Sequence, residues 1–179
     1  VYGANSGVGH LIAQCARALG ARVVGGVRGP RWNEALAALG VEPVDTTSPD
    51  AAGIVDAIAP EGVDVVVDLV GAVNAPLTSH VLGPRGRWLI VGLLGGAEVT
   101  LSLRDVIRRR WTVTGSSIRS LGPDDKRQAM AGVRDDLWPL VTEGRIAARI
   151  HRTVPRERVD DAWALMERGG TFGKTVLSG

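Results

Sequence analysis

The sequence has little of what several protein classes depend on. It contains a single cysteine, Cys15, which excludes an internal disulfide framework and fits a reducing compartment, so we expect a cytoplasmic protein. No apolar run approaches the roughly 20 residues that a membrane-spanning helix needs, which predicts no membrane partner. Hydrophobic residues make up 45% of the chain and charged residues 22%, the composition of a globular protein.

An excess of one charge is also lacking. The chain carries 21 basic and 19 acidic side chains, for a net charge of +2, which is too small to predict nucleic acid as a partner. Its histidines, His10, His80 and His151, lie far apart and share no metal-ligand spacing with Cys15, so we predict no metal site. No Ser-His-Asp or paired-carboxylate arrangement follows from the spacings, and the catalytic residues stay unknown.

Short apolar runs alternate with amphipathic helical stretches through the first two thirds of the chain. The runs contain few polar residues, which is typical of strands buried on both faces of a parallel sheet. The fold class predicted is therefore α/β, a Rossmann-type doubly wound parallel sheet of about six strands. Its strands are expected at the truncated pair Val1–Tyr2 and at residues 22–27, 41–45, 63–68, 87–91 and 111–114.

This rhythm changes after Gly122. Residues 123–143 are predicted to be mostly helical with an interruption at Pro139, and a further helix is expected at residues 156–168. Strands are expected at residues 146–154 and 174–177, yet nothing in this chain obviously pairs with them. They therefore indicate a segment that packs on a partner domain.

The glycine-rich turn near the start carries the strongest functional signal. It joins a strand to an apolar helix, and its small residues leave room for a phosphate at the helix N-terminus, where the amides and the dipole favour an anion. Only two residues precede it, so we expect a first strand entered partway. The candidate cofactor-binding residues here are Gly3, Ala4, Asn5, Ser6, Gly7, Val8 and Gly9.

The helix after this turn is predicted to bury one apolar face. That face consists of Val8, Leu11, Ile12, Cys15, Ala16 and Leu19, at helical spacing. Cys15 is interpreted as a structural thiol because it lies on this face. His10 is interpreted as an exposed residue of the first helical turn, although a histidine there could also approach a phosphate.

Two arginines follow the second predicted strand. An NAD-selective site usually has Asp or Glu near this point to hold the ribose 2′-hydroxyl, but Val27 cannot do so. Arg28 and Arg31 come directly after it, and their guanidinium groups could pair with a 2′-phosphate. This favours NADP(H) over NAD(H), the alternative being two solvated loop arginines.

Loops at the carboxyl ends of two later strands complete the candidate site. Ligands of open α/β sheets bind in the crevice at this edge. Val70 and Gly71 follow one strand, and Gly92 and Leu93 follow the next. These residues are expected near the nicotinamide end of an extended dinucleotide, with ordinary strand-to-loop turns as the alternative.

Four segments together resemble the medium-chain dehydrogenase/reductase superfamily. They are Val1–Gly9, the helix end Ala18–Ala21, Asp64–Gly71 and Gly86–Gly92. The closing residues Gly170–Leu177 are similar to the family's last Gly-Lys strand, and the resemblance runs from end to end of the chain. The most similar branch is that of the zinc-independent NADPH:quinone oxidoreductases.

The resemblance implies a specific organisation. Residues 1–136 would form the dinucleotide-binding Rossmann domain, and residues 137–179 would return to an N-terminal GroES-like catalytic domain that lies outside this sequence. Members of the branch transfer hydride from NADPH to a quinone or an α,β-unsaturated carbonyl in the interdomain cleft, without a metal. Many are homodimers paired through the sixth strand, which here would be Trp111–Ser116.

The chain also departs from the family pattern. Relatives often carry Ser-x-x-Lys after the second strand, where this chain has Gly29 and Trp32, and a tyrosine after the third strand, where it has Thr47. Two alternative functions remain open. One is the enoyl-reductase domain of a polyketide or fatty-acid synthase, and the other is a dinucleotide-binding module without turnover.

Overall fold

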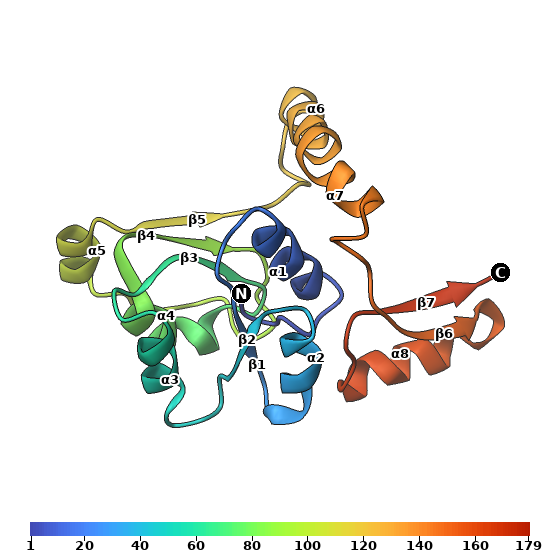
Figure 1. The fold of residues 1–179 in the computed structure, drawn as a ribbon, viewed down its shortest axis with the longest axis horizontal. Helices are drawn as coiled ribbons and strands as arrows, with labels where there is room; N and C mark the ends of the chain where they lie inside the picture. The colour runs from blue at the N-terminus through green and yellow to red at the C-terminus, as the bar shows by residue number, and fades with distance from the viewer.

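The computed structural model describes residues 1–179 and shows an α/β protein (Figure 1). The first part contains α1 (Gly9–Ala18), β1 (Val24–Val27), η1 (Pro30–Trp32), α2 (Asn33–Ala37), β2 (Glu42–Asp45), α3 (Ala51–Ile58), β3 (Val63–Asp68), η2 (Ala72–Asn74), α4 (Ala75–Val81), β4 (Leu82–Ile90), α5 (Leu103–Arg109) and β5 (Thr112–Gly115). The second contains α6 (Pro123–Gly132), η3 (Val133–Leu137), α7 (Trp138–Thr142), β6 (Ile150–Pro155), η4 (Arg156–Arg158), α8 (Val159–Arg168) and β7 (Lys174–Ser178).

The strands of the first part form one parallel arrangement around Tyr2. β1 pairs with β2, and β4 lies between β3 and β5. Tyr2 joins the two groups through parallel bridges to Gly26 on β1 and Asp68 on β3. The resulting order, β2-β1-Tyr2-β3-β4-β5, is that of dinucleotide-binding sheets, in which successive strands are added first on one side of the central strand and then on the other. The predicted doubly wound fold is confirmed.

Helices cover both faces of this sheet. One apolar cluster joins α1 and α2 to β1 through Ala13, Leu36 and Val27, while two others pack α3, α4 and α5 against the opposite face. Trp88 on β4 belongs to one of these two clusters and is 2% exposed. Burial of both faces explains why the strands are apolar without alternation.

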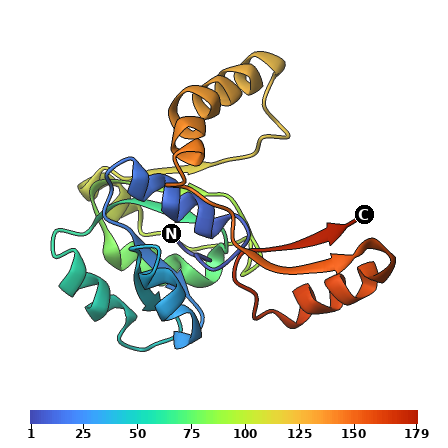
Figure 2. The same cartoon turned by 45° about the vertical axis from the view of Figure 1, so that its right-hand side comes forward.

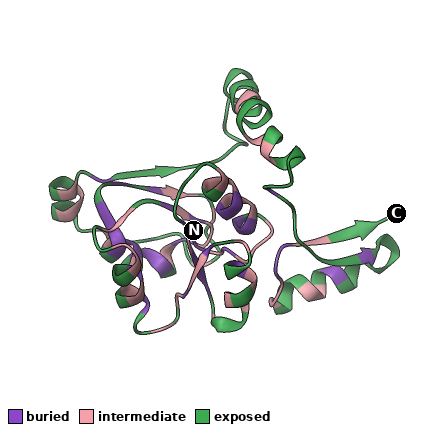
Figure 3. Ribbon diagram, in the orientation of Figure 1, coloured by how far each residue is buried: buried purple, intermediate pink, exposed green.

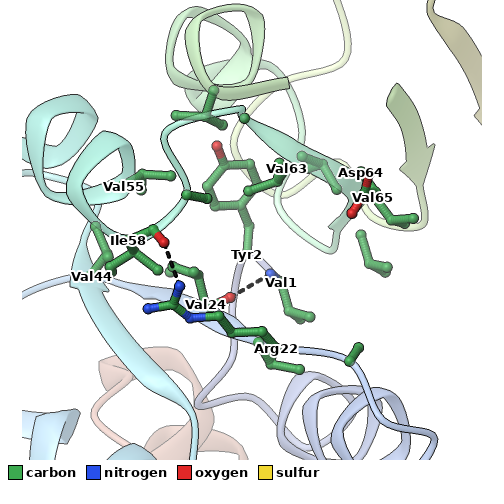
Figure 4. Close-up of a pocket in the computed structure, with 18 of the residues that line it drawn as sticks. Val1, Tyr2, Arg22, Val24, Val44, Val55, Ile58, Val63, Asp64 and Val65 are labelled. Carbon is green, nitrogen blue, oxygen red and sulfur yellow. Dashed lines mark hydrogen bonds between the residues drawn. The ribbon is translucent and has the colours of Figure 1, made fainter. Parts of the chain in front are cut away.

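The sheet leaves a cavity beside its shortest strand, the pair Val1–Tyr2. A cavity of about 420 Å³ lies between the start of β1 and the start of β3, walled mainly by apolar side chains (Figure 4). The Val1 amine donates to Val24 O at 2.8 Å, and the Arg22 guanidinium donates to Ile58 O at 2.5 Å across the opening. In this region β3 exposes Val65, which is unusual in the interior of a sheet.

The buried face of α1 differs from the predicted one. Its buried residues are Gly9, His10, Ala13 and Gln14, whereas Val8 and Leu19 are exposed and the other predicted residues are only half-buried. The reason is steric, because Gly9 must face the strand for the helix to approach it closely. That contact turns the helix so that small and polar side chains, rather than its longest apolar ones, lie underneath.

The second part of the chain corrects two further predictions. β6 and β7 pair with each other in parallel, so the late strands do have a partner within the chain. A parallel pair needs a crossover connection, which α8 provides. The helical stretch is not broken at Pro139: η3, a π-helical turn, leads into α7, and Pro139 occupies its first turn, where no N–H is needed.

Both ribbon views show this second part standing beside the sheet rather than on it (Figures 1 and 2). α6 and α7 project on one side, and the β6–α8–β7 unit projects on another. Most of this part is exposed (Figure 3). No helix of the protein combines the length and apolar character that crossing a membrane requires.

Candidate functional site

The glycine-rich turn follows Tyr2 and leads directly into α1. The Gly3 and Ala4 amides both donate to Gly26 O, and the Ser6 amide donates back to Gly3 O at 2.9 Å. Gly3 adopts a φ of +69°, which favours glycine. The turn is thus fixed on β1 before the helix begins, and Ala4, with no exposed surface, anchors it in the core.

Gly9 makes the close packing that the sequence predicts at this position. A Cβ on Gly9 would lie 2.1 Å from Gly3 O and 2.8 Å from Gly3 C, both backbone atoms. The Gly9 amide donates to Ser6 Oγ at 2.9 Å, so the hydroxyl helps to cap the helix. No larger residue fits at this position.

The amides of Gly7 and Val8, at the start of α1, have no acceptor within the protein. Backbone N–H groups are nearly always paired unless water or a ligand accepts from them. They lie at the positive end of a helix dipole, where an anion is favoured. These two donors are the part of the turn that could hold a phosphate.

Asn5 ties the glycine-rich turn to the second part of the chain, and its predicted cofactor contact stays a prediction. Its Nδ2 donates to Thr171 O at 2.9 Å, and its carbonyl accepts from the Gly173 amide at 2.8 Å. Asn5 therefore joins the turn to the segment that leads into β7. The side chain is occupied by this contact.

Lys174, at the start of β7, is a candidate that the sequence analysis missed. A Cβ on Gly7 would lie 3.1 Å from Lys174 Cγ and 3.5 Å from Lys174 Nζ, so the ammonium lies beside Gly7. Nothing in the local sequence indicates this, because 167 positions separate the two residues. Two features could have drawn attention to it: its scarcity, as one of two lysines in the chain, and its place in the closing segment that resembles the family.

The two arginines after β1 lie on the surface. Arg31 stacks on the Trp32 ring, with Cζ 4.9 Å from the ring centroid, and a Cβ on Gly170 would lie 2.9 Å from its Nη1. Arg28 is exposed, and neither arginine forms an ion pair with an acidic side chain. Both guanidinium groups keep their charge uncompensated.

Asp45 supports the loop that carries these arginines. Its Oδ1 accepts from the Gly29 amide at 2.9 Å, the Thr47 amide at 2.9 Å and the Thr47 hydroxyl at 2.6 Å. These bonds, led by that from the Thr47 hydroxyl, hold the pKa of the Asp45 carboxyl below its usual range. Thr47 is thus engaged with Asp45.

The loops after β3 and β4 are packed against each other and reach the glycine-rich turn. A Cβ on Gly92 would lie 2.3 Å from Leu69 O, and one on Gly71 would lie 2.5 Å from Gly96 O. A Cβ on Gly3 would lie 3.5 Å from Val70 Cγ2. Three of the predicted segments therefore meet at one edge of the sheet, where Leu93 is 55% exposed.

Asp68 holds this edge together, and the sequence analysis did not single it out. It is fully buried, with Oδ1 accepting from the Val70 and Gly71 amides at 2.8 Å each. Its Oδ2 accepts from Trp88 Nε1 at 3.2 Å. The carboxylate therefore fixes the loop after β3 to the core.

Two other predictions about α1 have different outcomes. His10 is fully buried, so its interpretation as an exposed residue is wrong. Cys15 is half-buried, and burial raises the pKa of its thiol, which agrees with a structural role rather than a nucleophilic one. No group of three or more His, Cys, Asp or Glu side chains in the protein is arranged to hold a metal.

With this geometry in view, comparison with known proteins gives the family. Residues 7–134 match the family described as "Zinc-binding dehydrogenase". The chain belongs to the zinc-binding dehydrogenase family. The resemblance to the medium-chain dehydrogenase/reductase superfamily, in its quinone oxidoreductase-like branch, is thereby confirmed.

Three relatives align with almost all of this dehydrogenase-family chain. It is 27% identical to the human "Synaptic vesicle membrane protein VAT-1 homolog" (99% of this chain, 49% of that protein), and 26% to "Quinone oxidoreductase" of Rattus norvegicus (99% and 53%). It is 25% identical to "NADP-dependent oxidoreductase RED1" of Cochliobolus heterostrophus (99% and 52%). The chain thus spans about half the length of the curated relatives it matches.

Two solved structures share the fold of this chain. A quinone oxidoreductase of Pseudomonas syringae superposes with a TM-score of 0.82 at 26% identity, covering 99% of this chain and 55% of that one. An NAD-dependent alcohol dehydrogenase superposes with a TM-score of 0.84 at 29% identity, covering 99% and 50%.

Proposed function

We propose that this chain is the dinucleotide-binding part of an oxidoreductase and that its ligand is NADP(H). The observation that carries the proposal is the pair of unpaired amides, of Gly7 and Val8, at the positive end of α1. Together with the nearby ammonium of Lys174, they form a cationic cradle of the kind that pyrophosphate fits. Because Gly9 has no side chain, α1 packs close to the strand, and the Gly7 and Val8 amides face the place proposed for the pyrophosphate.

The choice of NADP(H) over NAD(H) rests on Arg28 and Arg31. Val27 ends β1 where an acidic side chain would hold a ribose 2′-hydroxyl, and the two free guanidinium groups follow it. They would pair with a 2′-phosphate. The name of the Cochliobolus relative, an NADP-dependent oxidoreductase, supports this choice, while that of the alcohol dehydrogenase names NAD, so the proposal rests on Arg28 and Arg31.

For the activity we propose hydride transfer to a quinone or an α,β-unsaturated carbonyl. The bound dinucleotide supplies the hydride chemistry, and the protein holds the nicotinamide in position against the acceptor. Val70, Gly71, Gly92 and Leu93 would line its nicotinamide end, on the loops that Asp68 holds together. The names of the rat and Pseudomonas quinone oxidoreductases support this reaction class.

We further propose a homodimer paired through the edge strand at Trp111–Ser116. Every residue of β5 is exposed, and its outer edge has no neighbouring strand. An open edge of this kind favours pairing with a second strand. The predicted absence of zinc and the cytoplasmic location stay predictions.

Titration of the protein with NADPH and NADH, followed by nicotinamide fluorescence, tests the ligand. We expect NADPH to bind more tightly than NADH. Replacing both Arg28 and Arg31 by alanine should weaken NADPH binding at least about ten-fold, because charge-assisted bonds to the 2′-phosphate are lost. NADH binding should hardly change.

A matched control is Arg104→Ala with Arg108→Ala, two exposed arginines on α5, which precedes β5. This variant should bind NADPH like the wild type. Failure of both dinucleotides to bind would overturn the proposed function. NADH binding at least as tight as NADPH binding would remove the role of Arg28 and Arg31 alone.

A further inference from the structure

His10 connects the glycine-rich turn to the second part of the chain. Its ring is fully buried beneath α1, with Nδ1 2.8 Å from Ser6 O and Nε2 3.0 Å from the Arg149 amide. A carbonyl can only accept a hydrogen bond and an amide can only donate one. The imidazole must therefore be neutral, with its proton on Nδ1.

The backbone of Arg149 links His10 to Lys174. Its N–H donates to His10, and its carbonyl accepts from the Lys174 amide at 2.8 Å. Lys174 in turn places its side chain against Gly7. One continuous path of hydrogen bonds thus runs from Ser6, in the phosphate turn, through His10 and Arg149 to the backbone of the lysine beside that turn.

Neighbouring contacts also join α1 to the second part of the chain. Gln14, one turn after His10, donates to Ala147 O and accepts from the Ala147 amide, both at 3.0 Å. The Phe172 ring lies between those of His10 and Trp32, with centroid distances of 6.1 and 5.8 Å. His10 differs from these residues because it bonds both to the turn and to the peptide that pairs with Lys174.

We propose that His10 is a positioning residue that sets the place of the Lys174 ammonium beside Gly7, at the start of α1. The inference rests on the proposed function, since it is phosphate binding that the lysine would serve. His10 touches no ligand itself. It acts through the Arg149 peptide, which the neutral ring holds in place.

This arrangement makes phosphate binding sensitive to acid. Burial lowers the pKa of His10 below its ordinary value of 6.5, the bond to Ser6 O raises it, and the cations that face the ring, Lys174 on β7 and Arg149 before β6, lower it further. Above this pKa the ring is neutral and accepts from Arg149. Below it, a second N–H would oppose the Arg149 amide, and the connection to Lys174 would be lost.

Calorimetric titration with NADP+ tests the inference in the wild type, His10→Leu, Lys174→Met and the double variant. Each single variant should bind about ten-fold more weakly, and the double variant should be no weaker than Lys174→Met by more than about two-fold. That non-additivity is the signature of action through the lysine. Independent, multiplicative losses would overturn the inference.

A second variant covers the case in which His10→Leu fails to fold. In His10→Gln the amide keeps one donor and one acceptor but does not titrate, so it should recover most of the affinity that His10→Leu loses. Between about pH 5 and about pH 8, the wild type should lose affinity in acid more steeply than His10→Gln, beyond the change due to the ligand's own phosphate. Identical profiles would overturn the inference.

His80→Gln is the matched control, because His80 lies on α4 and pairs with Asp56 at an exposed site. It should leave both affinity and pH profile unchanged. If NADP+ does not bind to the wild type, the proposed function fails and the inference fails with it. If it binds while the His10 and Lys174 effects are independent, the inference alone fails. Nitrogen NMR of His10 provides a ligand-free check, since the Nδ1–H tautomer is expected.

Discussion

Residues 1–115 and residues 116–179 use the same building unit, parallel strands joined by a helix, yet they bury very different amounts of apolar surface. The first region packs helices on both faces of its sheet around Leu36, Val66 and Trp88. In the second, the buried residues are Ile146, Val154, Ala162, Phe172 and Gly173, and none lies in α6 or α7.

The difference shows what keeps each region ordered. A two-stranded sheet is at best marginally stable on its own, so the β6–α8–β7 unit depends on other contacts. These are hydrogen bonds to the glycine-rich turn and α1, through Asn5, His10 and Gln14. The second region is therefore kept in place by its bonds to the glycine-rich turn and α1. The first region positions that turn through its own packed sheet. The predictions below separate the two cases.

The largest effect is expected from Gly9→Ala, in the first region. The added methyl would overlap the Gly3 carbonyl, and neither backbone segment can move without disturbing the sheet. The free energy of unfolding should fall by about 3 kcal/mol, measured by urea denaturation. Gly115→Ala is the control, since a Cβ there meets nothing within 4 Å. Equal stability of the two variants would contradict the close packing of α1 on the strand.

An intermediate effect is expected from Asp68→Ala, at the carboxyl edge of β3. The change leaves the Val70 and Gly71 amides and Trp88 Nε1 without their acceptor in a buried place. Stability should fall by about 2 kcal/mol, and the Trp88 fluorescence should change. Asp64→Ala, on the exposed part of the same strand, should cost much less. A loss as large at Asp64 would show that the buried bonds are not the cause.

The smallest effect on global stability is expected from Gly173→Ala, in the second region. Gly173 has a φ of +86°, and a Cβ there would lie 2.1 Å from Arg149 O. The bond from the Gly173 amide to Asn5 should break, while the first region keeps its stability to within about 0.5 kcal/mol. Hydrogen exchange should then accelerate in β6, α8 and β7 and stay unchanged in β1 and β3.

Gly132→Ala provides the comparison for this experiment, because Gly132 lies in a helix of the same region with ordinary φ, and a Cβ there would meet only Asp136 Oδ2, at 4.0 Å. It should leave the exchange of β7 unchanged. If Gly173→Ala instead lowers the stability of the whole protein as Gly9→Ala does, the two regions fold as one unit. The contrast drawn above would then be wrong.

Several features could be predicted from sequence because they are local. β3 begins and ends where its apolar run does, and the α5 cap at Ser102 follows from a hydroxyl that accepts from the Asp105 amide three residues later. The turn at Gly3–Gly9 is equally local, since its glycines are required by the φ of Gly3 and by the close approach of Gly9 to Gly3. These signals placed most strands of the doubly wound sheet, the phosphate turn and the loops at the edge of the sheet.

What the sequence could not show depends on residues that are distant along the chain. The face of α1 was mispredicted because hydrophobicity predicts what a helix can bury, whereas the contact of Gly9 with Gly3 decides which side faces the strand. The pairing of β6 with β7, the burial of His10 and the place of Lys174 beside Gly7 all depend on how the second region docks. The sequence alone thus determined the elements and the phosphate turn, through steric and apolar patterns of short range. Only the tertiary structure decided which charged and polar groups meet there, because hydrogen-bonding partners 133 or more positions apart leave no periodic signal.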